Sequence, residues 1–221
     1  MAMSNTEATP LKILKPKLPK QLEPICLSDE GIDDEASFLQ FTCKDETLSE
    51  ITANKVLFDQ MTFDSVAFER VSLRHAELTD IVFRQCDLSN VDFSEAILHR
   101  VEFRHCKLVG IDLAAATLRN VRFEQCAGDY ATFRFANMKA VSFQSTTLIQ
   151  SDFYHSELSK VEFAECQIDK AQFSGTKLAG IDLSRTDFHN LGVTLEDLQG
   201  CIISPAQAIL FTRIFGLVVK E

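Results

Sequence analysis

The sequence predicts an all-β solenoid, a four-sided tube of stacked coils, and three regularities support this fold. Nearly every fifth residue from position 58 to position 198 is large and apolar: of these 29 positions, phenylalanine fills 13, leucine fills 12, and Met138, Ile168, Val193 and Gly128 fill the other four. A second column, two residues earlier, holds mostly small or β-branched residues such as Val56, Val66 and Ala76. Similar residues also recur at a spacing of 20, so four blocks of five complete one coil.

The period of five residues defines the geometry of each coil. It fits neither the 3.6-residue repeat of a helix nor the two-residue alternation of a strand. It fits a chain that turns a corner every five residues and places one large and one small side chain inside on each side. Coils stacked at the strand spacing of about 4.8 Å give about eight coils between residues 38 and 200, a rod roughly 40 Å long. One side carries Phe63, Phe83, Phe103, Phe123, Phe143 and Phe163 in its large column.

Cysteines recur in the small inward column of another side, at Cys86, Cys106, Cys126 and Cys166. Stacking would bring their thiols close together, so a metal or redox site is one interpretation. The other is packing, because alanine and valine fill the same column elsewhere and a free cysteine behaves as a small hydrophobe. The column favours packing. The chain has seven cysteines and no export signal in residues 1–24, which indicates reduced thiols in a cytoplasmic protein.

The blocks resemble the pentapeptide-repeat family, whose signature is a small residue, Asp or Asn, Leu or Phe, and two variable residues. It stands here as CDLSN at 86–90, VDFSE at 91–95 and IDLSR at 181–185. The resemblance covers roughly residues 38–200 and implies a right-handed, four-sided β-helix. Within the family the chain is similar to the Qnr and MfpA branch of fluoroquinolone-resistance proteins, and it most resembles the Qnr-like proteins of Gram-positive bacteria. The segments that carry this similarity are 126–137, where the repeat is locally broken, and 203–219.

The resemblance implies an acidic, dimeric rod that imitates B-DNA, binds DNA gyrase and topoisomerase IV, and relieves their inhibition by quinolones. The formal net charge of -10 disfavours nucleic acid as a partner, because nucleic-acid binding needs basic residues against phosphates. Asp92, Asp112 and Asp152 fall in one outward column and are the candidate partner-binding residues of the DNA-mimic face. Three roles are open for them: hydrogen bonds to the backbone at the corner, solubility, and recognition of a partner.

The chain outside the repeat is predicted to form two end segments. Residues 1–37 are an N-terminal extension and cap, in which lysines and prolines make residues 1–24 extended or disordered. The five-residue columns are degraded in residues 25–50, which we expect to close the N-terminal end of the rod. The repeat domain covers residues 38–200.

Residues 201–221 are predicted to form a C-terminal helix and tail. Ser204 suits the N-cap, Pro205 suits the first helical position, and Gly216 suits the end of the helix. Apolar residues of this segment either cap the last coil or pair with a second copy about a twofold axis. The candidate dimerisation residues are Ile209, Leu210, Ile214, Phe215 and Leu217.

The sequence contains no phosphate-binding glycine-rich loop, no HExxH motif, no CxxC pair and no nucleophile elbow. It therefore predicts no enzyme, no cofactor and no metal site. No three of its five histidines, at positions 75, 99, 105, 155 and 189, share one side with a carboxylate at ligand spacing. No apolar run approaches the 18 residues that a membrane helix needs, so no membrane partner is expected. Two functions remain: a topoisomerase-binding DNA mimic, and a structural or scaffolding repeat protein with an unknown protein partner.

Overall fold

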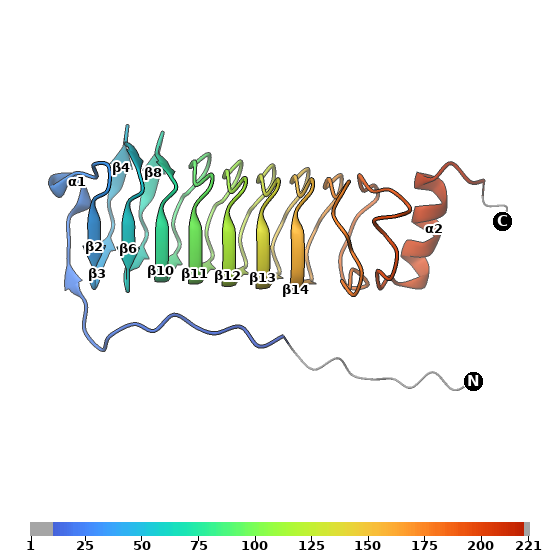
Figure 1. Cartoon of the computed structure of the whole chain (residues 1–221), viewed down its shortest axis with the longest axis horizontal. Helices are drawn as coiled ribbons and strands as arrows, with labels where there is room; N and C mark the ends of the chain where they lie inside the picture. The colour runs from blue at the N-terminus through green and yellow to red at the C-terminus, as the bar shows by residue number, and fades with distance from the viewer. Residues whose placement is uncertain (1–10, 219–221) are drawn as a thin grey trace.

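The computed structural model describes residues 11–218 and is a rod of stacked coils with a helix at one end (Figure 1). The predicted β-solenoid with a short C-terminal helix is therefore confirmed. The helices are α1 (Leu27–Glu30) and α2 (Pro205–Ile214). The strands are β1 (Glu23–Pro24), β2 (Ser37–Leu39), β3 (Phe41–Lys44), β4 (Thr47–Ser49), β5 (Thr52–Asn54), β6 (Leu57–Asp59), β7 (Thr62–Asp64), β8 (Ala67–Glu69), β9 (Ser72–Arg74), β10 (Glu77–Arg84), β11 (Ile97–Arg104), β12 (Thr117–Glu124), β13 (Asn137–Gln144) and β14 (Glu157–Ala164).

The strands β2 to β7 and β10 to β13 each pair in parallel with a strand one coil further along the chain, and the register is 20 residues. Phe83 lies opposite Phe103, which lies opposite Phe123 in the next coil. Seven strands, β2, β6 and β10 to β14, stack along one side in this way. After β14 the stack continues through single bridges, the last of which joins Asp182 to Ile202.

The corners of the tube fall at every fifth residue and have left-handed backbone conformation. Every such residue from Glu35 to Lys170 has a positive φ, and only one of these, Gly110, is a glycine. For an L-residue this conformation costs on the order of 1 kcal/mol. The stacking offsets that cost, because corner amides donate to carbonyl groups of the next coil, as Gln60 N does to Thr79 O at 2.9 Å.

The interior consists of stacked side chains of like kind. The rings of Phe103 and Phe123 lie 4.9 Å apart and nearly parallel, at 1°. Rings from the adjoining side meet them edge-on, as Phe133 meets Phe143 at 83°. All members of the predicted Phe63–Phe163 series are buried. Their burial and mutual contact supply the main stabilisation of the rod.

Segment 126–137, which the sequence suggests is a local break in the repeat, does not interrupt the backbone path. Single bridges carry the register through it, from Lys107 to Ala127 and onward to Thr147. The irregularity is Gly128, which stands in the large column. A Cβ there would lie 3.2 Å from Leu148 Cδ2, so the neighbouring leucine fills the space of the missing side chain. The break is one of residue type and not of fold.

The N-terminal end is covered by a short non-repeating segment. Leu27 of α1 is fully buried and belongs to the core, and β1 pairs with β3. Ahead of β1, residues 11–22 form an extended segment that runs back alongside the rod (Figure 1). The predicted extension therefore has an extended part, and its residues 1–10 lie outside the described residues.

Candidate interaction surface

The three candidate aspartates stand in one column on the outside of the rod. Backbone bridges join Asp92 to Asp112 and Thr132 to Asp152, so successive members of the column lie one coil apart. Ser72 precedes the aspartates and Gln172 follows them. The structure thus places Asp92, Asp112 and Asp152 on one side of the tube, in the positions that the five-residue frame gives them.

Each of these aspartates also bonds to the backbone of its own corner. In every case Oδ1 accepts the N–H of the second residue along the chain, which closes a local turn. Asp87 and Asp182, on other sides of the tube, make the same bond. One carboxylate oxygen of each aspartate therefore has a structural role, and the side chains themselves are partly exposed. The bonds are Ser94 N to Asp92 at 2.9 Å, Ala114 N to Asp112 at 2.8 Å, and Tyr154 N to Asp152 at 2.8 Å.

Asp92 has the best-defined electrostatic environment of the column. Its partial burial by itself raises its pKa, but hydrogen bonds from Ser94 and from the Ser72 hydroxyl outweigh this effect, and the pKa is lowered. The Ser72 Oγ lies 3.1 Å from Asp92 Oδ2. The carboxylate is therefore fully charged at neutral pH, as a column that presents negative charge requires.

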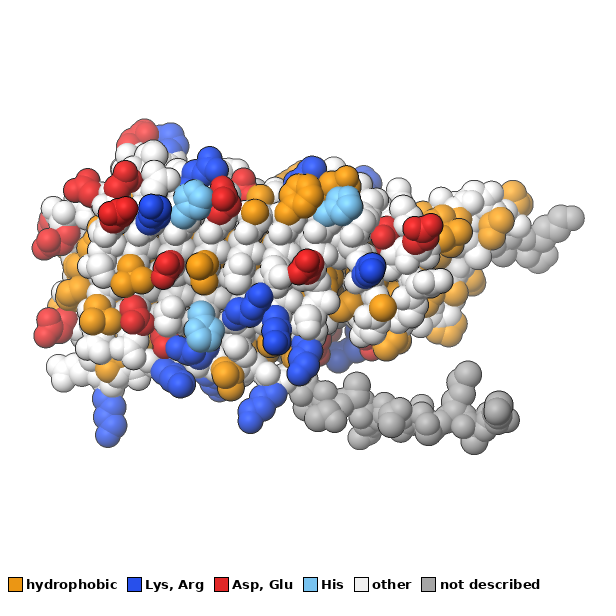
Figure 2. Space-filling view, viewed as in Figure 1, with side chains coloured by type: hydrophobic (Ala, Val, Ile, Leu, Met, Phe, Trp, Pro, Cys, Tyr) orange, Lys and Arg blue, Asp and Glu red, His pale blue; other side chains and the backbone are white. Residues whose placement is uncertain are grey.

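Asp152 differs from its companions because a cation lies against it. Arg134 Nη1 lies 3.1 Å from Asp152 Oδ2, and the guanidinium also lies over the ring of Tyr154 at 4.8 Å. The column is therefore partly neutralised at this end. Figure 2 shows the wider pattern, in which acidic and basic side chains are mixed over the visible face of the rod.

An exposed aromatic corner adjoins Asp152. Phe135 is 55% exposed, and its ring stacks on the ring of His155 at 5.9 Å and 8°. Tyr154 meets Phe135 edge-on. The next residue in this corner column is Gly175, where a Cβ would lie 2.7 Å from the imidazole. The glycine thus leaves room for the ring. Sequence reasoning missed this cluster, although an aromatic residue at a corner position was the available signal.

The C-terminal helix α2 closes the last coil through one polar and one aromatic side chain. Ser204 caps the helix and forms a reciprocal capping box with Gln207. The buried Gln207 amide also donates to two carbonyl groups of the last coil, Leu183 O at 2.8 Å and Thr186 O at 2.9 Å. Phe211, one helical turn further, packs on Phe188 at 5.5 Å. The predicted N-cap and first-turn proline are present.

The side of α2 that meets the rod carries a polar residue as well as apolar ones. Gln207 and Phe211 point inward, because the last coil leaves both carbonyl groups and an apolar column uncovered. Of the five candidate dimerisation residues, Ile209 and Leu217 are exposed, at 48% and 62%. The other three, Leu210, Ile214 and Phe215, are partly buried and pack against the chain's own core.

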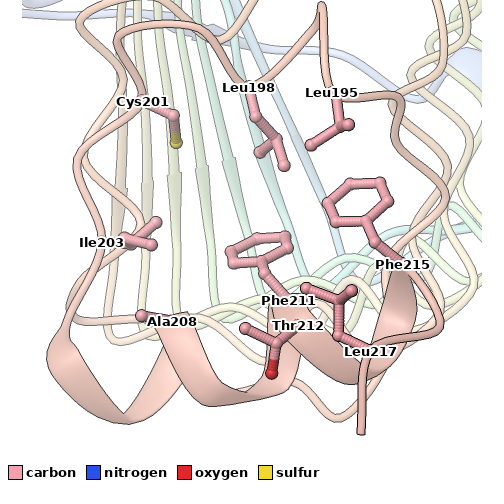
Figure 3. A pocket seen from close by; sticks show the side chains of 9 residues that line it. All are labelled: Leu195, Leu198, Cys201, Ile203, Ala208, Phe211, Thr212, Phe215 and Leu217. Atoms are coloured by element: carbon pink, nitrogen blue, oxygen red, sulfur yellow. The ribbon is translucent and has the colours of Figure 1, made fainter.

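An apolar groove lies between α2 and the turn that precedes it (Figure 3). Its volume is about 440 Å³. Leu198 and Phe211 point toward each other from opposite walls, and Leu195 and Phe215 lie together at one side. Apolar side chains also gather at this end in the space-filling view (Figure 2). The other lining residues are Cys201, Ile203, Ala208, Thr212 and Leu217.

The cysteines of the inward column are buried thiols with no arrangement for a ligand. Burial raises the pKa of Cys166 to about 11, so this thiol is neutral and unreactive near pH 7. Within residues 11–218, no group of histidine, cysteine and carboxylate side chains is placed to hold a metal ion. In the same range no helix is both long and apolar enough to cross a membrane.

Comparison with known families agrees with the observed repeat. The family described as "Pentapeptide repeat region" matches residues 76–153 and 96–173, and "Pentapeptide repeats (8 copies)" matches residues 166–202. The chain belongs to the pentapeptide-repeat family. No curated protein matches its sequence.

Several solved structures match the chain at low sequence identity. A trypsin-treated form of QnrB1, a plasmid-mediated fluoroquinolone resistance protein, is 19% identical with a TM-score of 0.36, and the match covers 85% of this chain and 100% of that one. HetL, which is involved in heterocyst differentiation regulation in the cyanobacterium Nostoc, is 16% identical with a TM-score of 0.33, over 77% of this chain and 90% of that one. Rfr23 from the cyanobacterium Cyanothece is 13% identical with a TM-score of 0.15, over 78% and 91%.

Proposed function

We propose that this chain is a non-catalytic rod that binds type II topoisomerases, DNA gyrase or topoisomerase IV, in place of DNA and protects them from fluoroquinolones. The observation that carries the proposal is the column of Asp92, Asp112 and Asp152, stacked at a regular spacing on one side of a rigid rod. The sequence similarity of segments 126–137 and 203–219 to the fluoroquinolone-resistance branch supports the same function.

The charge of the rod sets a limit on how closely it imitates DNA. Residues 41–200 hold 24 acidic and 16 basic residues, a balance of -8. Over a rod of roughly 40 Å this is about one net charge per 5 Å, whereas B-DNA carries one charge per about 1.7 Å. The rod therefore reproduces the sign and the direction of the charge at lower density, and shape must supply part of the affinity.

A supercoiling assay with purified gyrase and ciprofloxacin tests this function. We expect the protein to restore supercoiling at micromolar concentration. The variant Asp92→Asn/Asp112→Asn should need at least tenfold more protein, because it removes two charges of the column. Asparagine keeps the oxygen that accepts the corner N–H, so the turns remain bonded and the change is one of charge alone.

A matched control is the variant Asp87→Asn/Asp182→Asn, which removes the same number of charges from equivalent turns on other sides. It should protect gyrase as well as the unaltered chain. The proposal fails if the unaltered chain gives no rescue at micromolar concentration. The role of the column fails if the two variants lose protection equally, since net charge alone would then explain the effect.

A scaffolding function with a different protein partner is the second candidate, and the aromatic corner favours it. The exposed Arg134 and the partly exposed Tyr154 beside Phe135 are of the residue types that dominate binding energy in protein interfaces. For a scaffold we expect Phe135→Ser to lose a captured partner that contains no topoisomerase subunit, whereas Asp92→Asn/Asp112→Asn keeps it. The reverse pattern would support the aspartate column.

The apolar C-terminal end is proposed to join two copies of the rod. Ile209 is 48% exposed at that end, and Ile97, in the middle of the rod, is 45% exposed and serves as a matched control. In sedimentation experiments we expect Ile209→Glu to shift the protein from dimer to monomer and Ile97→Glu to leave it dimeric. A monomeric unaltered chain, or a dimer that survives Ile209→Glu/Leu217→Glu, would contradict this arrangement.

A further inference from the structure

The extended N-terminal segment, residues 11–22, is held on the rod by one column of corner residues. Asp80 Oδ1 accepts the N–H of Lys17 at 2.8 Å, and Gln60 donates to the Lys17 carbonyl oxygen at 3.1 Å. Further along, Asn120 Oδ1 accepts the N–H of Leu14 at 3.2 Å. Gln60, Asp80 and Asn120 belong to one corner of the tube, at residues 60, 80, 100 and 120, which we name the clamp corner. All three bonds use the backbone of the arm.

The spacing of these contacts matches an extended peptide laid along the axis of the rod. Asp80 and Asn120 are two coils apart, roughly 10 Å at the strand spacing of about 4.8 Å. Lys17 and Leu14 are three residues apart, and an extended chain covers roughly 10 Å in three residues. The clamp corner therefore places polar groups at a spacing that matches the backbone groups of an extended peptide. This spacing follows from the stacking of the coils.

The arm buries an ion pair that the same geometry leaves exposed elsewhere. Asp80 and Arg100 form a two-bond pair between neighbouring corners, and their side chains are only 5% and 14% exposed. Glu50 and Arg70 form the equivalent pair on another corner, and there the exposed fractions are 68% and 66%. The two pairs differ in solvent exposure because the hydrogen bond from Lys17 N to Asp80 places the arm directly over the Asp80–Arg100 pair.

The electrostatics of the pair explain why it can be covered. Burial by itself raises the pKa of Asp80, but the hydrogen bonds from Arg100 and from the Lys17 backbone outweigh it, and the pKa is lowered. Both side chains thus stay charged and paired, and the Asp80 carboxylate can still accept a hydrogen bond from a peptide N–H. A paired and pre-oriented acceptor is well suited to recognise backbone without demanding a particular side chain.

We propose that the clamp corner is a peptide-binding site and that the chain's own arm is its resident ligand. The site reads an extended backbone and one aliphatic side chain, since Ile13 is buried on the rod at 8% exposure whereas Leu14 is 47% exposed. The arm carries four lysines in residues 11–22, opposite in sign to the acidic rod. The partner that fits is therefore an extended segment of another protein with lysines, prolines and an aliphatic anchor. The tethered arm competes with such a segment and keeps the surface closed.

The proposal is tested in the full-length chain with an arm-release variant, Ile13→Asp/Leu14→Pro. The first change charges the buried anchor, and the second removes the N–H that Asn120 accepts. The probe is a fluorescent peptide with the sequence of residues 11–22, followed by anisotropy. A tethered ligand competes at an effective concentration of about a millimolar. We therefore expect the arm-release variant to bind the probe at least tenfold more tightly than the unaltered chain.

Two controls separate clamp binding from charge attraction. A scrambled peptide of the same composition should bind the arm-release variant at least tenfold more weakly. Adding Gln60→Ala/Asn120→Ala, which leaves the Asp80–Arg100 pair intact, should abolish binding while the thermal unfolding temperature stays within a few degrees. The proposal is overturned if the probe binds neither form, binds both equally, or binds no better than its scrambled version. Dimerisation of the variant by exchange of arms would also overturn it, because the occupant would then be a second copy.

Discussion

The middle of the rod and its C-terminal end are built from the same apolar columns, but their side chains have different neighbours. In the middle, the ring of Phe123 stacks on Phe103 at 4.9 Å and on Phe143 at 4.7 Å, so a coil has equal neighbours on both sides. At the end, the ring of Phe188 meets the ring of Phe211 of α2 instead of a stacked neighbour, at 5.5 Å and tilted by 54°. A repeating stack is thus self-sufficient inside, whereas its end needs residues that do not repeat.

The largest effect is expected from a change inside the stack. Phe123→Ala removes a fully buried ring and leaves a cavity that rigid neighbouring coils cannot fill, which should cost about 3–5 kcal/mol of unfolding free energy. Urea denaturation measures this loss. The exposed Phe135→Ala should cost less than about 1 kcal/mol. A similar loss in both variants would show that stacking inside the rod has no special weight.

A smaller and more local effect is expected at the end. Gln207→Ala leaves the carbonyl groups of Leu183 and Thr186 without their buried donors, at a cost of about 1–3 kcal/mol. Amide exchange should accelerate in the last coil and in α2, whereas β11 and β12 should keep their rates. Equal acceleration along the whole chain would contradict independent closure of the end.

The smallest expected effect is the loss of stability at low pH that Asp92 causes. The pKa of Asp92 is lowered in the folded protein, below the unfolded value of about 3.9. Its contribution to stability is therefore complete above about pH 4 and is lost as the pH falls through the folded pKa. Between about pH 5 and pH 2, the melting temperature of Asp92→Asn should fall less than that of the unaltered chain. Ser72→Ala removes one of the stabilising hydrogen bonds, so its melting temperature should fall by an intermediate amount. The same dependence of melting temperature on pH in all three proteins would contradict this role of Asp92.

The sequence predicts the repeating columns and the C-terminal helix with its Ser204 cap, but it misses the contacts that non-repeating segments make with the rod. The Phe63–Phe163 series and the column of Asp92, Asp112 and Asp152 are visible because each coil offers the same environment, so the same residue type returns after 20 positions. Gln207 could not be assigned, since its partners are carbonyl groups that only a missing next coil exposes.

The clamp corner was equally hidden from sequence reasoning. Gln60, Asp80, Arg100 and Asn120 look like ordinary polar corner residues, and their common role appears only when the arm lies across them. The aromatic corner at Phe135 could have been found, because a large apolar residue at an outward position departs from the pattern. Periodicity thus gives the fold and the columns, whereas contacts between the rod and non-repeating segments need the structure.

Native-state hydrogen exchange along the chain tests most directly the claim that each coil is held by its two neighbours. We predict the slowest exchange in β11 to β13, a gradual increase in rate through residues 165–203, and the fastest exchange among the folded segments in α2. Exchange that is uniform from β2 to α2, or slowest in α2, would contradict it.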